Sequence, residues 1–183
     1  RQAAAGVPTR FLTASLEDFA TDTVEQQATI AVLRQFHETF GQAPSSLIFS
    51  GKLGVGKTHA AAALVSAWLR SGRTACFCSA IGLVRSVRDS WNTKASEKSA
   101  LRKYTDVALL VIDEIGVQTG TPNERAILSD VINSRYEYIR PTVIVGNLTL
   151  DEFNAFLGER AMDRFREGGR MLVFPWTSRR GTE

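Results

Sequence analysis

The sequence has few of the residues that build metal sites, disulfide frameworks or membrane spans. Its 183 residues include two cysteines and two histidines, and no second Cys or His pair completes a zinc site beside Cys76 and Cys78. No apolar run is long enough to cross a bilayer, and the N-terminus has no basic segment followed by an apolar one. We therefore predict a cytoplasmic protein with no membrane partner, in which both cysteines are small buried thiols.

Strong charge bias, internal repeats and low-complexity tracts are also missing. The net charge is +3, which permits contact with a polyanion without requiring it. With 44% hydrophobic residues, the chain can bury the core of one ordinary domain and hardly of two. We predict one domain at residues 23–183, preceded by an alanine-rich N-terminal arm or linker at residues 1–22.

The most informative segment follows the apolar run at 47–49 and reads Gly-Lys-Leu-Gly-Val-Gly-Lys-Thr, which matches the pattern G-x-x-x-x-G-K-S/T at every fixed position. Glycines allow a tight turn that presents backbone N–H groups to a triphosphate, and the helix that follows adds its positive N-terminal dipole. We predict that Lys57 reaches the β- and γ-phosphates of ATP and that the Thr58 hydroxyl holds Mg²⁺. The predicted ATP- or ADP-binding residues of this segment are Gly51, Gly54, Val55, Gly56, Lys57, Thr58 and His59.

A second group of candidate catalytic residues directly follows the apolar run at 109–112. These residues are Asp113 and Glu114. Open α/β sheets bind ligands at the carboxyl ends of their strands. We predict that Asp113 contacts Mg²⁺ through its water shell and that Glu114 orients or deprotonates the attacking water. Alone, such a run often marks a solvated turn, but the phosphate-binding motif upstream favours the catalytic interpretation.

Local patterns predict strands alternating with helices, and so a parallel sheet covered on both faces. Three capping boxes, at Thr23, Thr121 and Thr149, mark helix starts. The stretch between Trp91 and 107 is polar and charged, and we predict no element there. The predicted strands end at 79, 112, 146 and 174, after the first strand at 47–49.

Residues 50–58, 109–118 and 157–164 together resemble the AAA+ ATPase domain of DnaC-type bacterial replicative helicase loaders, which are relatives of the IstB transposition ATPases. The resemblance implies an AAA+ P-loop NTPase core with five parallel strands flanked by helices, and a lid that is minimal or absent. It also implies that Asn147 senses the γ-phosphate, although the residues alone would make Asn147 an ordinary turn residue. Arg180 resembles an arginine that contacts phosphate in the same subunit.

The resemblance also assigns a role to an arginine that reaches the nucleotide site of a neighbouring subunit, and Arg164 matches it best. Arg160 lies one helical turn earlier on the same face. The alternative is a surface helix in which both arginines pair with Glu159 and Asp163, and such pairs contribute little. An arginine that acts in the nucleotide site of a neighbouring subunit, called an arginine finger, implies self-association into a helical oligomer. It also implies slow ATP hydrolysis by the isolated subunit.

Single-stranded DNA binding is the other implied activity. Arg85, Arg88 and Trp91 are spaced three apart, so an aromatic ring would lie beside cations on one helix face. Thr121 falls in a segment that resembles a second DNA-facing loop. The alternative is that Trp91 belongs to the core and that the cations form a solvated face.

The leading hypothesis is a helicase-loader ATPase domain that binds ATP with Mg²⁺ and single-stranded DNA. It would assist the loading of a DnaB-type hexameric helicase at replication initiation. In this family, the helicase is contacted by a separate N-terminal domain, which we do not expect in this chain. Two alternatives stay open: an IstB-like ATPase that regulates transposition on duplex DNA, and a nucleotide-switched binding module or P-loop kinase.

Overall fold

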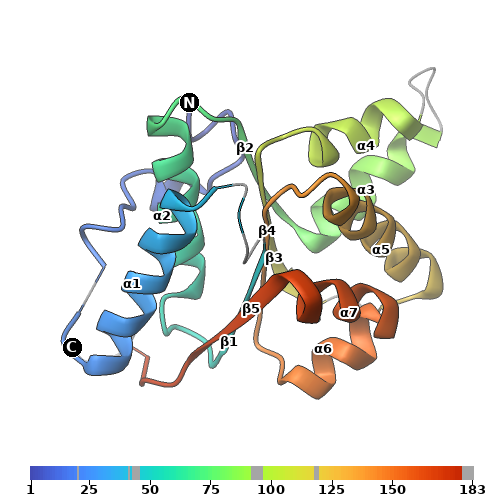
Figure 1. The fold of residues 1–183 in the computed structure, drawn as a ribbon. Helices are drawn as coiled ribbons and strands as arrows, with labels where there is room; N and C mark the ends of the chain where they lie inside the picture. Colours follow the sequence, from blue (N-terminus) through green and yellow to red (C-terminus); the bar gives the residue numbers. More distant parts are fainter. Residues whose placement is uncertain (20, 41, 43–45, 92–96, 118–119, 179–183) are drawn as a thin grey trace.

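The computed structural model describes residues 1–19, 21–40, 42, 46–91, 97–117 and 120–178. Their centre is a five-stranded sheet in the order β2-β3-β4-β1-β5, and every neighbouring pair of strands is parallel (Figure 1). The predicted parallel sheet is therefore confirmed. The strands are β1 (Ser46–Gly51), β2 (Ala75–Ser79), β3 (Leu109–Ile115), β4 (Thr142–Gly146) and β5 (Gly169–Phe174).

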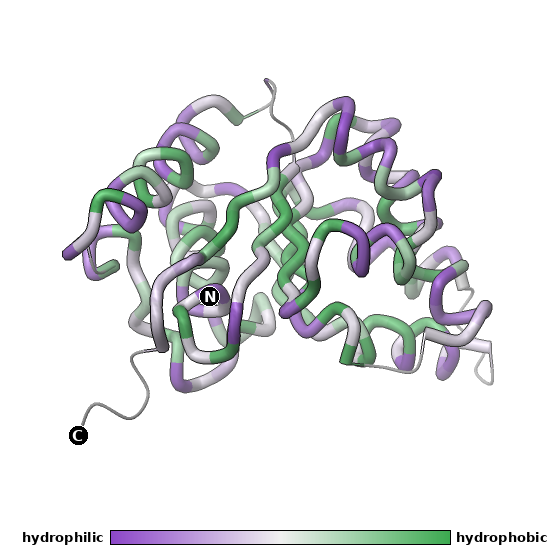
Figure 2. Tube along the Cα trace, turned by 90° about the horizontal axis from the view of Figure 1, so that it is seen from below, coloured by the Kyte–Doolittle hydropathy of each residue, from purple (hydrophilic) through white to green (hydrophobic). Residues whose placement is uncertain are grey.

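Two groups of helices cover the two faces of the sheet. The apolar core is correspondingly split into two clusters, one beneath each group. Figure 2 shows the apolar residues concentrated along the strands between the groups. One group contains α1 (Val24–Glu38) and α2 (Lys57–Arg70), and the other contains α3 (Ala80–Trp91), α4 (Glu97–Thr105), α5 (Pro122–Glu137), α6 (Leu150–Leu157) and α7 (Glu159–Gly168).

Helix starts follow the local sequence closely. Thr23, Thr121 and Thr149 are the N-caps of α1, α5 and α6, and each makes a reciprocal capping box with the residue three positions later. These three predicted starts are confirmed. No helix in the described part of the chain is both long and apolar enough to span a bilayer.

Two predictions about the elements were wrong. We predicted no element in the polar stretch after Trp91, but this stretch contains α4. Its Tyr104 is buried in the core cluster beneath α3–α7, and its Leu101 packs against that cluster. Isolated helices this short are marginal in water, so tertiary contacts stabilise α4. Strand β3 continues to Ile115 and therefore includes both carboxylates of the predicted site. Of the two cysteines, Cys76 is buried and Cys78 is half-buried.

The N-terminal segment, predicted as an arm or linker, packs on the domain over much of its length. Val7, Ala14 and Leu16 are buried in the cluster beneath α1 and α2. The backbone N–H of Phe77 on the edge strand β2 donates to the Ala5 carbonyl at 2.6 Å. This segment therefore covers part of an otherwise open sheet edge.

Arg135 of α5 is a buried cation that sequence analysis did not single out. Its side chain is fully buried, and burial lowers its pKa to about 9. The guanidinium joins the end of α4, the start of β3 and the start of β4, because its hydrogen bonds end on backbone carbonyls from all three. The acceptors are the carbonyls of Tyr104, Thr105, Val107, Ala108 and Pro141 and the hydroxyl of Thr142.

Candidate nucleotide-binding site

A cleft of about 390 Å³ opens at the carboxyl edge of the sheet. Its lining includes the loop between β1 and α2, the ends of β3 and β4, and parts of the N-terminal segment. Strand β4 lies between β1 and β3, so Asn147 at its end is placed between the phosphate-binding loop and the carboxylates. The fold thus brings three separate sequence motifs to one cavity, as open α/β sheets do.

The turn from the end of β1 into α2 requires glycine at two positions for different reasons. At Gly51 (φ 147°), a β-carbon would lie 2.6 Å from the Phe174 carbonyl oxygen, so a side chain would displace β5. Gly56 is the N-cap of α2 and has φ 96°, a left-handed conformation that glycine adopts without strain. The loop therefore delivers the chain directly into the N-terminus of α2, where unpaired N–H groups and the helix dipole favour an anion.

Lys57, the first residue of α2, is buried against this loop. Its Nζ donates to the carbonyl oxygens of Gly51 and Lys52, both at 2.7 Å. The ammonium group is therefore held in the cradle where the predicted phosphates would lie. This position fits the predicted role of Lys57, which stays a prediction.

Thr58 and Asp113 are close enough to interact, and together they fit a hydrated Mg²⁺ ion. Burial is the main cause that raises the pKa of Asp113 above its usual range, while hydrogen bonds from the Glu114 N–H and Thr58 oppose the shift. The Asp113 Oδ1 accepts the Glu114 N–H at 2.8 Å. A buried carboxylate beside a hydroxyl suits a small cation that keeps several waters.

Glu114 has a strained backbone. Its φ is 60°, and the pairing of β3 with β4 shifts register between Ile112 and Ile115. A non-glycine residue held in the left-handed region costs about 1–3 kcal/mol and is typical of functional positions. This irregularity leaves Asp113 buried and the Glu114 side chain exposed at the cleft, so the two adjacent carboxylates have different environments.

His59 and aromatic side chains form another wall of the cleft. Phe11 and Phe19 meet the His59 ring edge-on, with ring centroids 6.2 Å and 5.9 Å away. Burial lowers the pKa of His59. Phe19 and Trp176 were missed by sequence analysis because no local motif marks them, and Trp176 is fixed by its indole N–H, which donates to the Val55 carbonyl at 2.8 Å.

The predicted finger residues lie away from this cleft. Arg164 on α7 places its guanidinium 4.6 Å from the centre of the Tyr136 ring and 3.9 Å from Glu167 Oε2. Among described residues, its ion-pair partner is Glu167, three positions later on the same helix, so Arg164 does form a surface pair, but with a different partner from Glu159 or Asp163. Arg160 is exposed on the same helix. Arg180 lies outside the described residues.

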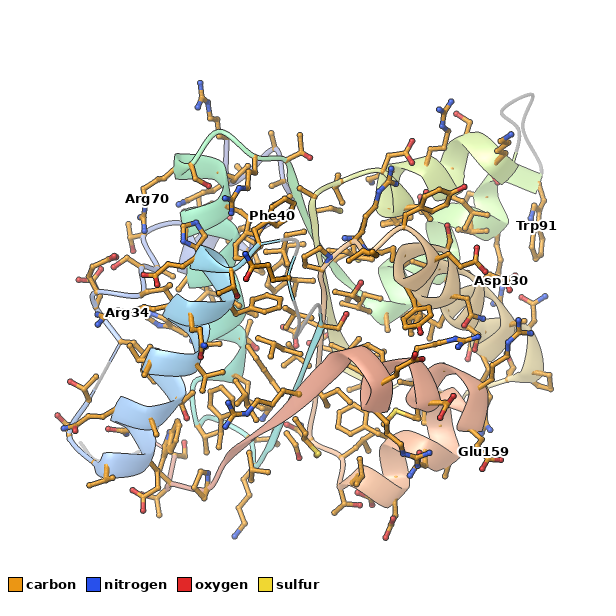
Figure 3. All side chains as sticks on the ribbon, viewed as in Figure 1. Arg34, Phe40, Arg70, Trp91, Asp130 and Glu159 are labelled. Atoms are coloured by element: carbon orange, nitrogen blue, oxygen red, sulfur yellow. The ribbon has the colours of Figure 1, made fainter. Side chains whose placement is uncertain are left out.

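The predicted DNA-contacting residues lie together around α3 and the start of α5. Trp91 is 48% exposed on the side of the molecule far from α1 and α2, so the core alternative was wrong (Figure 3). Arg85 is exposed, and Arg88 contacts the first turn of α5, where Thr121 is the N-cap. Their role in DNA binding stays a prediction.

Fold and site define the class of protein: an AAA+ P-loop protein, with the phosphate-binding loop after β1 and the Asp-Glu pair on β3. The chain belongs to the family of IstB-like ATP-binding proteins, whose family profile matches residues 4–165. It is 36% identical to the replicative helicase loader DnaC of Escherichia coli K12 over 168 residues, covering 91% of this chain and 69% of that protein. The loader resemblance is thereby confirmed.

Solved structures support the same fold. The crystal structure of a DnaC helicase loader matches with a TM-score of 0.81 at 24% identity, covering 91% of this chain and 99% of that one. The replication initiator DnaA, solved with AMPPCP and single-stranded DNA, matches with a TM-score of 0.79 at 18% identity, over 91% of this chain and 50% of that one. At these identities, the structural likeness establishes the fold alone.

Proposed function

We propose that this chain binds and hydrolyses ATP with Mg²⁺, binds single-stranded DNA, and assists the loading of a hexameric replicative helicase. The observation that carries the proposal is the single cleft that joins the glycine loop, Thr58, Asp113, Glu114 and Asn147. The likeness to the E. coli helicase loader is the reason for proposing helicase loading as the process. ATP and replicating DNA would place this work in the cytoplasm.

Bound ATP would supply the phosphoryl group, and each residue of the cleft has a separate task. The loop N–H groups and Lys57 would neutralise the phosphate charge, and Thr58 and Asp113 would hold Mg²⁺, which would offset further charge on the phosphates. Glu114 accepts a proton from the attacking water or orients it, and Asn147 contacts the γ-phosphate from the end of β4. Because these groups come from three strands, small shifts between β1, β3 and β4 would alter the rate.

Arg164 is not among the residues that line the cleft of its own subunit, and neither is any other residue of α7. We propose that it acts in a neighbouring subunit of a helical oligomer, where such fingers contribute roughly 10³ to 10⁵ in rate. Trp91 would stack on a base while Arg85 contacts phosphate. This arrangement would link DNA binding, assembly and hydrolysis.

The proposal is tested by measuring the affinity for a fluorescent single-stranded oligonucleotide and for its matching duplex. Salt is held fixed because phosphate contacts make the affinity steeply salt-dependent. Each measurement is made with ADP and with a non-hydrolysable ATP analogue. Preference for the single strand, strengthened by the analogue, supports the loader function; binding of neither DNA removes it.

A second candidate function is favoured by the description of the matching family, which is named for IstB. In that case the protein would act on duplex DNA as an ATP-dependent regulator of transposition. A clear duplex preference in the same experiment would favour this candidate.

A further inference from the structure

Arg88, one of the predicted DNA contacts, is already engaged by the first turn of α5. Its Nε donates to the Asn123 Oδ1 at 3.3 Å, and its NH2 lies 3.8 Å from the Glu124 Oε1. The Arg88 side chain is nevertheless 39% exposed, whereas that of Glu124 is 11% exposed. One side of the guanidinium therefore faces α5 while part of the group stays accessible.

Glu124 is held in place by the helix that it caps. Its Oε2 accepts the Thr121 N–H at 3.0 Å, and its own N–H donates to the Thr121 hydroxyl. These bonds leave Oε1 to face Arg88. The carboxylate is therefore mostly buried and is held beside Arg88 by its bond to the Thr121 N–H.

A phosphate at Arg88 would compete with this carboxylate. At 3.8 Å the contact with Glu124 is an ion pair, and the hydrogen bond of Arg88 goes to the Asn123 Oδ1, so a phosphate would have to share the guanidinium with both groups. A fixed negative charge beside the cation would also repel the phosphate. The existing pair is partly exposed and therefore weak, which leaves it displaceable.

We propose that Glu124 competes with DNA phosphate for Arg88 and thereby limits the affinity of this protein for single-stranded DNA. The inference rests on the proposed single-strand binding and specifies how that surface is regulated.

The decisive variant is Glu124→Gln, which removes the charge and keeps an amide oxygen for the Thr121 N–H, as capping boxes allow. Affinity for a fluorescent oligo-dT strand is measured by anisotropy at several salt concentrations with a non-hydrolysable ATP analogue. We expect Glu124→Gln to bind about threefold to tenfold more tightly, with the salt slope steeper by about 0.7 if one phosphate contact is gained. Arg88→Ala should weaken binding, and Glu124→Gln should give no gain in the Arg88→Ala background.

Asp89→Asn is the matched control, because Asp89 is exposed on the same helix and forms no ion pair among the described residues. It removes the same charge near Arg88 and should leave the affinity nearly unchanged. An equal gain in Asp89→Asn would overturn the proposal in favour of a general charge effect. Asn123→Ala frees the Arg88 Nε without touching the cap, and a smaller gain there provides a second test if Glu124→Gln folds poorly.

The outcomes separate the two proposals. Binding by the wild type with no gain in Glu124→Gln would overturn the competition while leaving single-strand binding intact. Failure of both wild type and Glu124→Gln to bind any single strand would overturn the proposed function itself.

Discussion

Replacing Arg135 tests whether one buried cation holds the end of α4 and the starts of β3 and β4 together. In Arg135→Leu, the carbonyls of Tyr104 and Pro141 lose hydrogen bonds that are fully buried, whereas the bonds lost by the carbonyls of Thr105, Val107 and Ala108 are only part-buried. A buried acceptor left unpaired costs about 1–3 kcal/mol, and leucine needs no desolvation of charge. For these two acceptors the expected loss of unfolding free energy is therefore about 2–6 kcal/mol.

Urea unfolding followed by circular dichroism measures this loss. Arg102→Ala is the control, because Arg102 forms an exposed pair with Asp106 at 3.0 Å in the same region. That pair should contribute only about 0.3–0.5 kcal/mol. Arg135→Lys keeps the charge but has fewer hydrogen-bond donors, so its loss of unfolding free energy should fall between those of Arg102→Ala and Arg135→Leu. A loss below about 1 kcal/mol in Arg135→Leu would refute the idea that these carbonyls depend on Arg135.

Three further predictions concern the nucleotide site, the finger and the response to acid. Lys57→Ala should weaken binding of a fluorescent ATP analogue by about 10- to 100-fold, since a charge-assisted hydrogen bond contributes about 1.5–3 kcal/mol, while Lys52→Ala in the same loop should bind normally. Arg164→Ala should lower ATP turnover with nearly unchanged nucleotide affinity. Wild-type turnover per subunit should rise with protein concentration. A rate that is independent of concentration, together with an unaffected variant, would exclude the role of Arg164 as an arginine finger. Hydrogen bonds from Arg140 and Arg102 lower the pKa of Asp106 below 3.8, so its stabilising contribution is present above that pH and lost as the pH falls through the folded-state value. Asp106→Asn should therefore flatten the pH dependence of stability in this acid range, and an unchanged profile would contradict the pairing.

Local sequence determined the parts of this protein that depend on neighbouring residues. Glycine spacing and a following helix former define the phosphate-binding loop, and a threonine with Glu or Gln three positions later defines a helix start. Apolar runs of strand length predicted the sheet. These features could be predicted because their causes are backbone conformation and hydrogen bonds that reach only a few residues along the chain.

Tertiary structure alone decided the features whose causes lie far apart in sequence. The left-handed conformation of Glu114 arises in a strand whose pairing with β4 shifts register, and α4 exists because its apolar side packs on the core. Arg135 is buried among carbonyls from three elements, and Arg88 meets Glu124 across two helices. Such contacts depend on how distant segments pack, so no local pattern of the sequence contains them.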